Sequence, residues 1–258
     1  MTFADAKQRF SNRAADYVRY RPGYPSELRD VLRKECDLRP GHVIADIGSG
    51  TGFLSELFLK NGNRVYGVEP NSEMRHAGEE YLASYDGFSS IEGSAESTTL
   101  EDASVDFVTA GQAFHWFEPE KTRAEFRRIL RPQGWVVAIW NFREMETLFA
   151  RAYEDILVKY GTDYARVRDS YPQSHDVQGF FLGGEFLHHT LPNVQFLDWD
   201  GLAGRLRSSS YIPREGHANF VPMTDALREL FRSYQENGRV RVEYATHLYA
   251  GRLPTERK

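Results

Sequence analysis

The chain has 258 residues, of which 41% are apolar, and its formal net charge at pH 7 is -5. This length suits one sizeable domain, or one domain with an elaboration, because a single core stops growing near about 250–300 residues. The acidic balance argues against broad phosphate-driven binding of nucleic acid, which needs a basic face. No apolar run approaches the roughly 20 residues of a membrane-spanning helix, so such a helix is excluded.

The cysteine content, the N-terminal segment and the balance of arginine over lysine narrow the class of protein further. The only cysteine is Cys36, which excludes an intramolecular disulfide and any metal site with several cysteines. The N-terminus shows no basic segment followed by an apolar one, so no secretory signal is predicted, and a reducing, cytoplasmic location is expected. Most of the basic residues are arginines. Coding bias is the simplest explanation, and recognition of carboxylates or phosphates by some of them is the alternative.

The first predicted element is a helix. Apolar side chains recur at near-helical spacing over Phe3–Tyr20, and the prolines at 22 and 25 prevent the helix from continuing. From residue 40 the chain alternates short β-rich runs with helical patterns, which is typical of βαβ units and a parallel sheet. The predicted strands are His42–Ile47, Arg64–Glu69, Phe88–Glu92, Val105–Gly111 and Trp135–Asn141. The predicted helices between them are Gly52–Lys60, Ser72–Ser84 and Pro119–Leu130.

The rhythm changes after Asn141. The pattern predicts a helix, an irregular stretch, a strand, a second helix and a final alternating strand. These are Phe142–Tyr160, Gly161–Gly184, Thr190–Leu202, Thr224–Glu236 and Arg239–Tyr249. The simplest arrangement is a doubly wound sheet closed by late strands. An insertion near the carboxyl ends of the strands would cap a pocket there.

The strongest chemical signal is the run Asp46–Gly52, which follows a buried strand and precedes a helix. Glycines at alternate positions permit a tight turn and let a ligand approach the backbone. The run is not the dinucleotide fingerprint, because Phe53 stands where the last glycine is required, and no lysine follows as in a P-loop. Asp46 would repel a pyrophosphate and suits a ligand with a cationic amine.

A second signal is the acid that ends the next strand. Glu69 lies 21 residues after Gly48. A carboxylate at this strand end can accept hydrogen bonds from two ribose hydroxyls and would repel a 2′-phosphate. Together with the glycine turn, Glu69 predicts a site for a ribose-bearing ligand.

Residues 40–141 resemble the class I S-adenosylmethionine-dependent methyltransferases. The motifs that match in chain order are Asp46-x-Gly48-x-Gly50-x-Gly52, Glu69, Gly93–Glu96, Val105–Val108 and Leu130–Trp135. Tyr20–Pro25 and Gln112–Phe117 resemble the type-11-like, small-molecule subgroup similar to trans-aconitate methyltransferase. The resemblance implies a Rossmann-like, doubly wound, seven-stranded α/β sheet, mostly parallel with an antiparallel last strand. It also implies methyl transfer from S-adenosylmethionine to an O or N atom of a small molecule, with carboxylic acids among the candidates.

The resemblance implies a set of cofactor-binding residues. They are Tyr20, Arg21, Asp46, Gly48, Ser49, Gly50, Gly52, Glu69, Pro70, Met74, Ser94, Ala95, Glu96 and Gln112. Asp46 and the glycine turn would hold the methionine end, and Glu69 the ribose. Met74 would pack against the adenine, or else belong to the ordinary core. Many relatives have aspartate where this chain has Ser94, which leaves the Ala95 N–H and Glu96 to contact the adenine.

The same resemblance suggests roles for the N-terminal segment and for one histidine. Tyr17, Tyr20 and Arg21 would close over the cofactor, with Arg21 paired to its carboxylate; a surface helix ending at a proline turn is the alternative. His115 follows the fourth predicted strand. It is interpreted as a catalytic base, as a pocket-lining residue or as a structural one. Its aromatic neighbours at 114, 116 and 117 suit the core, although one of them could face the sulfonium.

The implied domain organisation has four parts: a helical lid (1–36), a cofactor-binding core (37–141), a cap and substrate region (142–222), and a helix and strand that complete the sheet (223–258). A carboxylate acceptor would need no base at neutral pH and could be clamped by arginines of the cap. The candidates are Arg143, Arg205, Arg207 and Arg214, with Tyr211 expected nearby. No metal site, nucleic acid or membrane partner is predicted. Two other classes stay open: a nicotinamide-dependent oxidoreductase, and a methyltransferase-like protein that binds the cofactor without turnover.

Overall fold

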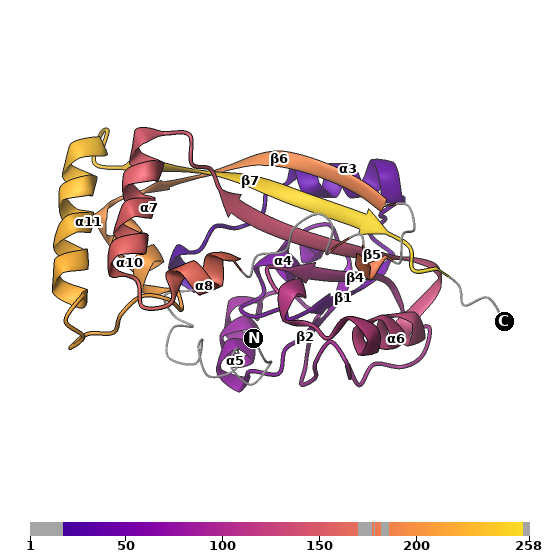
Figure 1. Cartoon of the computed structure of the whole chain (residues 1–258). Helices are drawn as coiled ribbons and strands as arrows, with labels where there is room; N and C mark the ends of the chain where they lie inside the picture. The colour runs from indigo at the N-terminus through magenta and orange to yellow at the C-terminus, as the bar shows by residue number, and fades with distance from the viewer. Residues whose placement is uncertain (1–17, 170–176, 178, 182–185, 255–258) are drawn as a thin grey trace.

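A computed structural model describes residues 18–169, 177, 179–181 and 186–254. Its centre is a seven-stranded sheet with the strand order β3-β2-β1-β4-β5-β7-β6 (Figure 1). The strands are β1 (Val43–Ile47), β2 (Arg64–Val68), β3 (Phe88–Ile91), β4 (Val105–Gly111), β5 (Leu130–Arg143), β6 (Phe186–Leu197) and β7 (Val240–Gly251). The first five strands are parallel, and β7 runs antiparallel to both of its neighbours. The predicted Rossmann-like sheet with an antiparallel last strand is confirmed.

Helices cover both faces of the parallel part of the sheet. All helices of the described residues, including those that lie elsewhere, are α3 (Glu27–Cys36), α4 (Phe53–Leu59), α5 (Ser72–Tyr81), α6 (Pro119–Ile129), α7 (Leu148–Tyr160), α8 (Tyr164–Asp169), α10 (Trp199–Arg207) and α11 (Phe220–Tyr234). A short 3-10 helix, η1, spans Phe114–Trp116. Successive side chains of β1 point to opposite faces. Ile44 therefore joins the core under α3 and α4, while Ala45 joins the core under α6. This burial on both faces explains the nearly continuous apolar runs of the inner strands.

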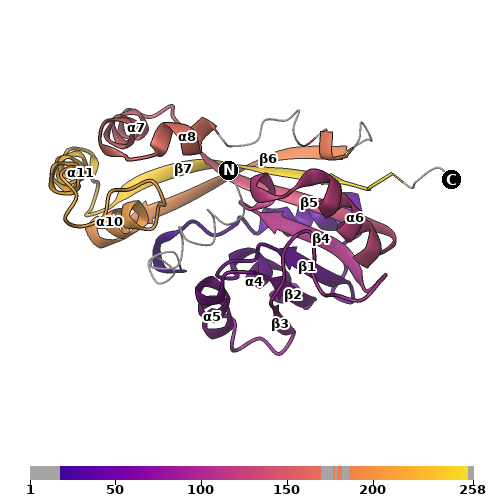
Figure 2. The same cartoon turned by 60° about the horizontal axis from the view of Figure 1, so that its bottom comes forward.

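A third core lies away from the first two. Both views show α7, α10 and α11 gathered around one end of β6 and β7, away from β1–β3 (Figures 1 and 2). Its buried residues include Leu157 of α7, Leu202 of α10, Leu227 of α11 and Val242 of β7. The helix predicted over Thr224–Glu236 therefore packs with the helices of the cap region.

The structure corrects the predictions made for residues 130–202. Phe142 and Arg143 pair with β7, so they extend β5 instead of opening a helix. The helix begins at Leu148, where the Thr147 side chain accepts a hydrogen bond from the Ala150 N–H at 3.1 Å. The predicted irregular stretch contains α8.

The strand predicted over Thr190–Leu202 has different bounds. It begins at Phe186 and ends at Leu197. The Asp198 carboxylate accepts a hydrogen bond from the Gly201 N–H at 2.8 Å and so caps a new helix, α10. At the other boundary, Leu130 begins β5 instead of ending the preceding helix. Side-chain caps at Thr147 and Asp198 and strand pairing, with β7 at Phe142 and with β4 at Leu130, outweigh the local periodicity.

The N-terminal segment crosses the ends of two strands. The helix predicted over Phe3–Tyr20 lies outside the described residues except for its last three, which are helical. Asn141 of β5 and Asn193 of β6 donate hydrogen bonds to the Gly23 carbonyl at 3.2 and 2.9 Å. Gln195 donates to the Tyr20 carbonyl at 3.2 Å. No helix in the described part of the chain is both long and apolar enough to cross a membrane.

Candidate cofactor and acceptor sites

The glycine turn follows β1 at the point where the strand order reverses between β1 and β4, which is where ligands bind in open α/β sheets. Gly48, Gly50 and Gly52 have φ of 66°, 55° and 88°, a region that side-chain-bearing residues rarely adopt. A Cβ on Gly48 would lie 2.6 Å from the Ala113 Cβ. The turn therefore needs glycine for its backbone conformation and for its close approach to the segment after β4.

Asp46 is fully buried beneath this turn. One carboxylate oxygen accepts a hydrogen bond from the Ser55 hydroxyl at 2.6 Å, and the other accepts one from the Thr109 hydroxyl at 3.2 Å. Burial raises the pKa of Asp46 to about 6, although both hydroxyl donors lower it. The carboxylate is thus mostly ionised at pH 7, in surroundings that favour a cationic partner.

Glu69, just after β2, reaches across to the glycine turn. Its Oε2 accepts a hydrogen bond from the Gly50 N–H at 3.0 Å, and its Oε1 accepts one from the Asn71 N–H at 2.8 Å. The residue is 9% exposed. Each oxygen retains further lone-pair capacity for a ligand hydroxyl, which fits the predicted contact with a ribose.

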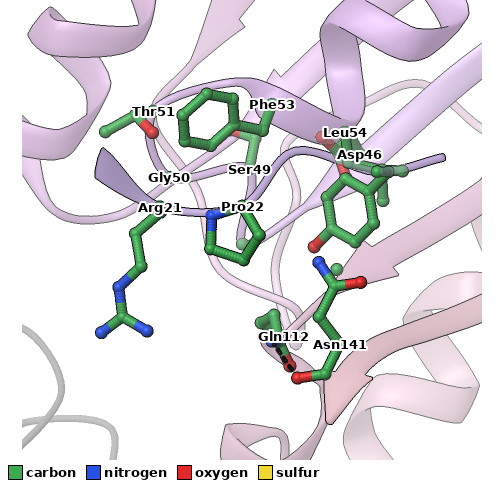
Figure 3. Close-up of a pocket in the computed structure, with 13 residues that line it drawn as sticks. Arg21, Pro22, Asp46, Ser49, Gly50, Thr51, Phe53, Leu54, Gln112 and Asn141 are labelled. Carbon is green, nitrogen blue, oxygen red and sulfur yellow. Dashed lines mark hydrogen bonds between the residues drawn. The ribbon is translucent and has the colours of Figure 1, made fainter. Parts of the chain in front are cut away.

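A cavity opens in front of the glycine turn and encloses about 510 Å³ of empty space, open solvent included. Its walls come from the turn and α4, from the N-terminal segment, and from the ends of β4 and β5 (Figure 3). The predicted site residues among its lining are Arg21, Asp46, Gly48, Ser49, Gly50 and Gln112. We call it the cofactor cavity.

Gln112 forms part of the wall between β4 and β5. Its φ of 57° is in the left-handed region, and residues held in such conformations cluster at functional sites. Its N–H donates to the Ile139 carbonyl at 2.9 Å, and its side-chain amide donates to the Asn141 carbonyl at 3.2 Å (Figure 3). Its Oε1 is buried, and the structure gives it no hydrogen-bond partner among the described residues. Thr51 also lines the cavity, and its Oγ1 is likewise buried without a hydrogen-bond partner among the described residues.

Several predicted cofactor residues lie near the cavity without lining it. Gly52 is buried behind the turn, where its Cβ would meet Leu82 at 2.5 Å. A Cβ on Gly50 would lie 3.4 Å from the Met74 Cε, so Met74 is a core residue placed beside the turn. Pro70 lies between Glu69 and Asn71 at the start of α5.

The loop after β3 is held by its own contacts. The Ser94 hydroxyl accepts from the Glu96 N–H at 3.3 Å, and Glu96 accepts from the Glu118 N–H at 3.0 Å. Ala95 is buried in the core under α6. The predicted adenine contacts of this loop therefore stay a prediction.

Tyr20 and Arg21 face the cap region. The Tyr20 ring lies against Gly204 of α10, where it fills the space a Cβ would need. The Arg21 Nη2 donates to the Ser208 carbonyl at 3.3 Å and to the Ser209 hydroxyl at 3.2 Å. Figure 3 shows the Arg21 side chain extending away from Ser49 and Gly50. Tyr17 lies outside the described residues.

His115 lies in η1, where its ring contacts the ring of Trp116 with the centroids 4.8 Å apart and the planes tilted by 40°. Burial lowers the pKa of His115 to about 4. His115 is not among the described residues that line the cofactor cavity, nor among those that line the second cavity described below. This placement favours the structural interpretation. The neighbouring Phe114 is buried in the core under α6.

A second cavity adjoins the first and encloses about 730 Å³ of empty space, open solvent included. The two cavities share Arg21, Pro22, Gln112 and Asn141 as a common wall. The remaining lining comes from the end of β5, from α7, α8 and α10, and from Tyr211 and Tyr244. We call it the acceptor cavity, because a small molecule in it would face the cofactor cavity across this wall.

Among the described residues, four guanidinium groups and one carboxylate line the acceptor cavity. The charged lining residues are Arg21, Arg143, Arg168, Arg205 and Glu154. Two of the four arginines predicted from the sequence as a clamp, Arg143 and Arg205, are therefore in place. The other two, Arg207 and Arg214, are exposed and do not line either cavity. Tyr211 lies in the lining, as predicted.

Among the lining residues that were not predicted from the sequence are Asn141, Glu154, Tyr164 and Arg168. Glu154 forms an ion pair with Arg143 and a hydrogen bond with the Tyr164 hydroxyl. Glu154 lies on α7, whereas its partners lie on β5 and α8, so no spacing along a single helix could have linked the carboxylate to them in advance. Asn141 stood at the end of a predicted strand, which was the one available signal for it.

A glycine turn at the switch point of this sheet, joined to an acid after β2, defines a Rossmann-like methyltransferase fold. Residues 45–138 match the family model of the methyltransferase domain. An uncharacterized methyltransferase of Geobacillus kaustophilus is 30% identical over 157 residues, which cover 57% of this chain and 71% of that protein. The chain belongs to this methyltransferase family.

Two further comparisons agree with this assignment. An uncharacterized methyltransferase of Mycobacterium tuberculosis is 33% identical over 165 residues, and the match covers 64% of each protein. The chain therefore spans slightly less than two thirds of that relative. The solved structure of a candidate type II methyltransferase from Anaeromyxobacter dehalogenans has a TM-score of 0.61 at 24% identity, covering 91% of this chain and 98% of that one. This likeness supports the fold.

Proposed function

We propose that the protein is an S-adenosylmethionine-dependent methyltransferase that methylates an O or N atom of a small molecule. The observation that carries the proposal is the hydrogen bond between Glu69 and the Gly50 N–H, which joins a ribose-type acid to a glycine turn in front of a cavity. The acceptor cavity directly beside it supplies room for a second ligand. The subgroup similar to trans-aconitate methyltransferase is part of this proposal.

The residues present fit the cofactor. Gly48 and Gly50 line the cavity with backbone alone, so a ligand can approach the turn closely. Asp46 would favour the cationic amine of the methionine end, and Glu69 would accept hydrogen bonds from the ribose. The buried, unpartnered Oε1 of Gln112 and Oγ1 of Thr51 offer polar contacts at the cavity wall. When bound, S-adenosylmethionine supplies an activated methyl group to the lone pair of an acceptor atom and leaves as S-adenosylhomocysteine.

The protein's own contribution is to position the ligands and exclude water. Methyl transfer gains most from holding the reacting atoms at near-attack distance, about 3–3.5 Å. The N-terminal segment, tied to β5 and β6 through its Gly23 carbonyl, closes one side of both cavities with Arg21 and Pro22. We propose that residues 1–36 act as a lid, 37–141 as the cofactor-binding core, 142–222 as the cap, and 223–258 as the closing elements.

The excess of arginine in the acceptor cavity favours an anionic acceptor, and we propose a carboxylic acid. Guanidinium groups recognise carboxylates through paired, charge-assisted hydrogen bonds. A carboxylate that is itself methylated needs no base at neutral pH, whereas a hydroxyl or ammonium group must lose a proton. A cytoplasmic location and a small-molecule partner belong to the same proposal.

The proposal is tested by ligand-induced stabilisation. A ligand present at about 100 times its dissociation constant adds roughly 2.7 kcal/mol to the free energy of unfolding. For a chain of this size that should raise the melting temperature by about 5–10 °C. S-adenosylhomocysteine should produce the shift, and NAD should not. A shift with NAD alone would favour a nicotinamide-dependent enzyme. Binding of S-adenosylhomocysteine without methylation of any acceptor would favour a binding protein.

A further inference from the structure

Arg205 in the acceptor cavity carries a buried charge that no described carboxylate neutralises. It is 5% exposed. Its Nε donates to the Tyr244 hydroxyl at 2.6 Å, and its Nη1 donates to the Tyr153 hydroxyl at 3.1 Å. The guanidinium lies 5.4 Å from the centre of the Tyr244 ring and 5.6 Å from the centre of the Tyr153 ring. Phenol oxygens and aromatic faces stabilise a cation, but they bring no negative charge.

Glu154, the one acidic residue in the described lining, pairs with other arginines. The Glu154 carboxylate pairs with Arg143 and lies 3.7 Å from Arg168. The Arg143 guanidinium also lies over the Tyr153 ring, 4.7 Å from its centre. Glu154 is thus engaged by Arg143 and Arg168, and no carboxylate among the described lining residues pairs with Arg205. A buried charge of this kind is stable when a bound ligand supplies the opposite sign.

Tyr211 provides a second, independent feature at the same place. Its side chain is buried, with the residue 8% exposed, and it lines the acceptor cavity. Its ring meets the Tyr164 ring edge-on at 4.8 Å, and its carbonyl accepts from the Thr162 N–H at 3.0 Å. Within the described structure its hydroxyl has no hydrogen-bond partner. Ring and backbone are therefore fixed, while the O–H remains available to a ligand.

Arg205 and Tyr211 line only the acceptor cavity and are not part of the wall that the two cavities share. Asn141 belongs to that wall, whereas Arg143, two residues further along β5, lines only the acceptor cavity. Two residues of a strand span about 7 Å. Tyr244, which holds Arg205, pairs with Arg143. A group bound at Arg205 therefore lies beyond the end of β5 that faces the cofactor cavity, away from Gln112 and Asn141.

We propose that the acceptor is bifunctional. Arg205 and Tyr211 hold an anionic anchor group, a carboxylate, and a separate O or N atom of the same molecule faces the Gln112–Asn141 wall and receives the methyl group. This inference rests on the proposed methyltransferase function and refines its substrate class. The anchor carboxylate stays unmethylated, and the acceptor is long enough to reach from Arg205 to the shared wall.

The test compares matched acids and amides. Binding to the protein saturated with S-adenosylhomocysteine is measured by calorimetry for 4-hydroxybenzoate and 4-hydroxybenzamide, for 4-aminobenzoate and 4-aminobenzamide, and for 5-hydroxypentanoate and its amide. We expect the acid to bind about tenfold or more tightly than the amide in at least one pair, because only the acid can form charge-assisted hydrogen bonds. No preference for the acid in any pair, while S-adenosylhomocysteine binds normally, would overturn the inference. Failure of S-adenosylhomocysteine to bind would instead contradict the proposed function.

Two variants and one control locate the anchor. Tyr211→Phe should reduce the preference for the acid by about three- to tenfold, while the affinity for S-adenosylhomocysteine is unchanged. Arg205→Gln should abolish the preference. If Arg205→Gln does not fold, Tyr211→Phe still tests the anchor. Arg207→Gln, on the exposed side of the same helix, should keep the full preference. An undiminished preference in Tyr211→Phe, or a methyl ester formed at the anchor carboxylate from labelled S-adenosylmethionine, would contradict the assignment.

Discussion

Glu69 accepts a hydrogen bond from the Gly50 N–H at 3.0 Å, so the acid after β2 and the turn after β1 are directly joined. Burial raises the pKa of Glu69, while the N–H groups of Asn71 and Gly50 and the charge of Arg75 lower it. The carboxylate is therefore held in position before any ligand arrives, and a ribose would meet an acceptor that is already oriented.

Replacing Glu69 should weaken the binding of the cofactor. Glu69→Ala removes a charge-assisted acceptor, so we expect the affinity for S-adenosylhomocysteine to fall by about 1–3 kcal/mol, measured by calorimetry. Glu80→Ala is the matched control, because Glu80 is an exposed acid on α5. Equal affinities of Glu69→Ala and the unmodified protein would remove Glu69 from the ribose site.

Two glycines of the turn should respond differently to alanine. A Cβ at position 52 would lie 2.5 Å from the Leu82 Cδ1 in the core, whereas one at Gly50 would meet the flexible end of Met74 at 3.4 Å. Both have positive φ, which costs roughly 1–2 kcal/mol for a residue with a side chain. Gly52→Ala should lose about 1–3 kcal/mol more in the free energy of unfolding, from overpacking. Urea denaturation measures the difference, and equal losses would contradict the packing argument.

Asp46 should make stability depend on pH in a defined direction. Burial raises its pKa from 3.8 to about 6, so the native state binds a proton more readily than the unfolded state does. The contribution of Asp46 to stability is therefore largest below about pH 4 and is lost as pH rises to about 6, by roughly 3 kcal/mol. Urea titrations of Asp46→Asn and of the unmodified protein at several pH values isolate this effect. A constant difference between the two across this window would refute it.

The same group should control the affinity for a ligand with a cationic amine. Asp46 is ionised above about pH 6 and neutral below it. Binding of S-adenosylhomocysteine should therefore weaken as pH falls from 7 to 5, and Asp46→Asn should flatten this dependence while lowering the affinity at pH 7. Calorimetry at each pH gives both values. An equally steep dependence in the variant would assign the effect to another group.

His115 should contribute little to catalysis. With its pKa lowered to about 4, the imidazole is neutral across the physiological range and is a weak base. We expect His115→Gln to keep the affinity for S-adenosylhomocysteine, to keep the rate of methyl transfer within about threefold, and to leave the pH profile unchanged. Loss of an ionisation from the pH profile, together with a rate lowered a hundredfold or more, would restore His115 as the base.

The pattern of residues was sufficient for the parallel part of the fold and for the cofactor side of the site. Strands buried on both faces, such as Val105–Gly111, are continuous apolar runs, and the glycine turn needs a residue type that few other backbone conformations require. Glu69 was predictable because its distance from the turn along the chain is set by one βαβ unit. These features depend on local geometry, which the sequence encodes directly.

Just beyond Asn141 the secondary structure depends on pairing with β7, a strand more than 95 residues away in the chain, which the local pattern does not reveal. Phe142 and Arg143 have helical periodicity but form strand hydrogen bonds with β7, because pairing satisfies more backbone groups than an isolated helical turn would.

By itself the sequence determined the positions of the inner strands along the chain, the glycine turn and the acid that meets it. Only the tertiary structure decided which arginines line a cavity, because exposure depends on helix packing. Arg205 and Arg207 are two residues apart on α10, yet one is buried against Tyr153 and Tyr244 while the other is exposed. A helix turns by about 200° over two residues, so one position faces the core and the other the solvent.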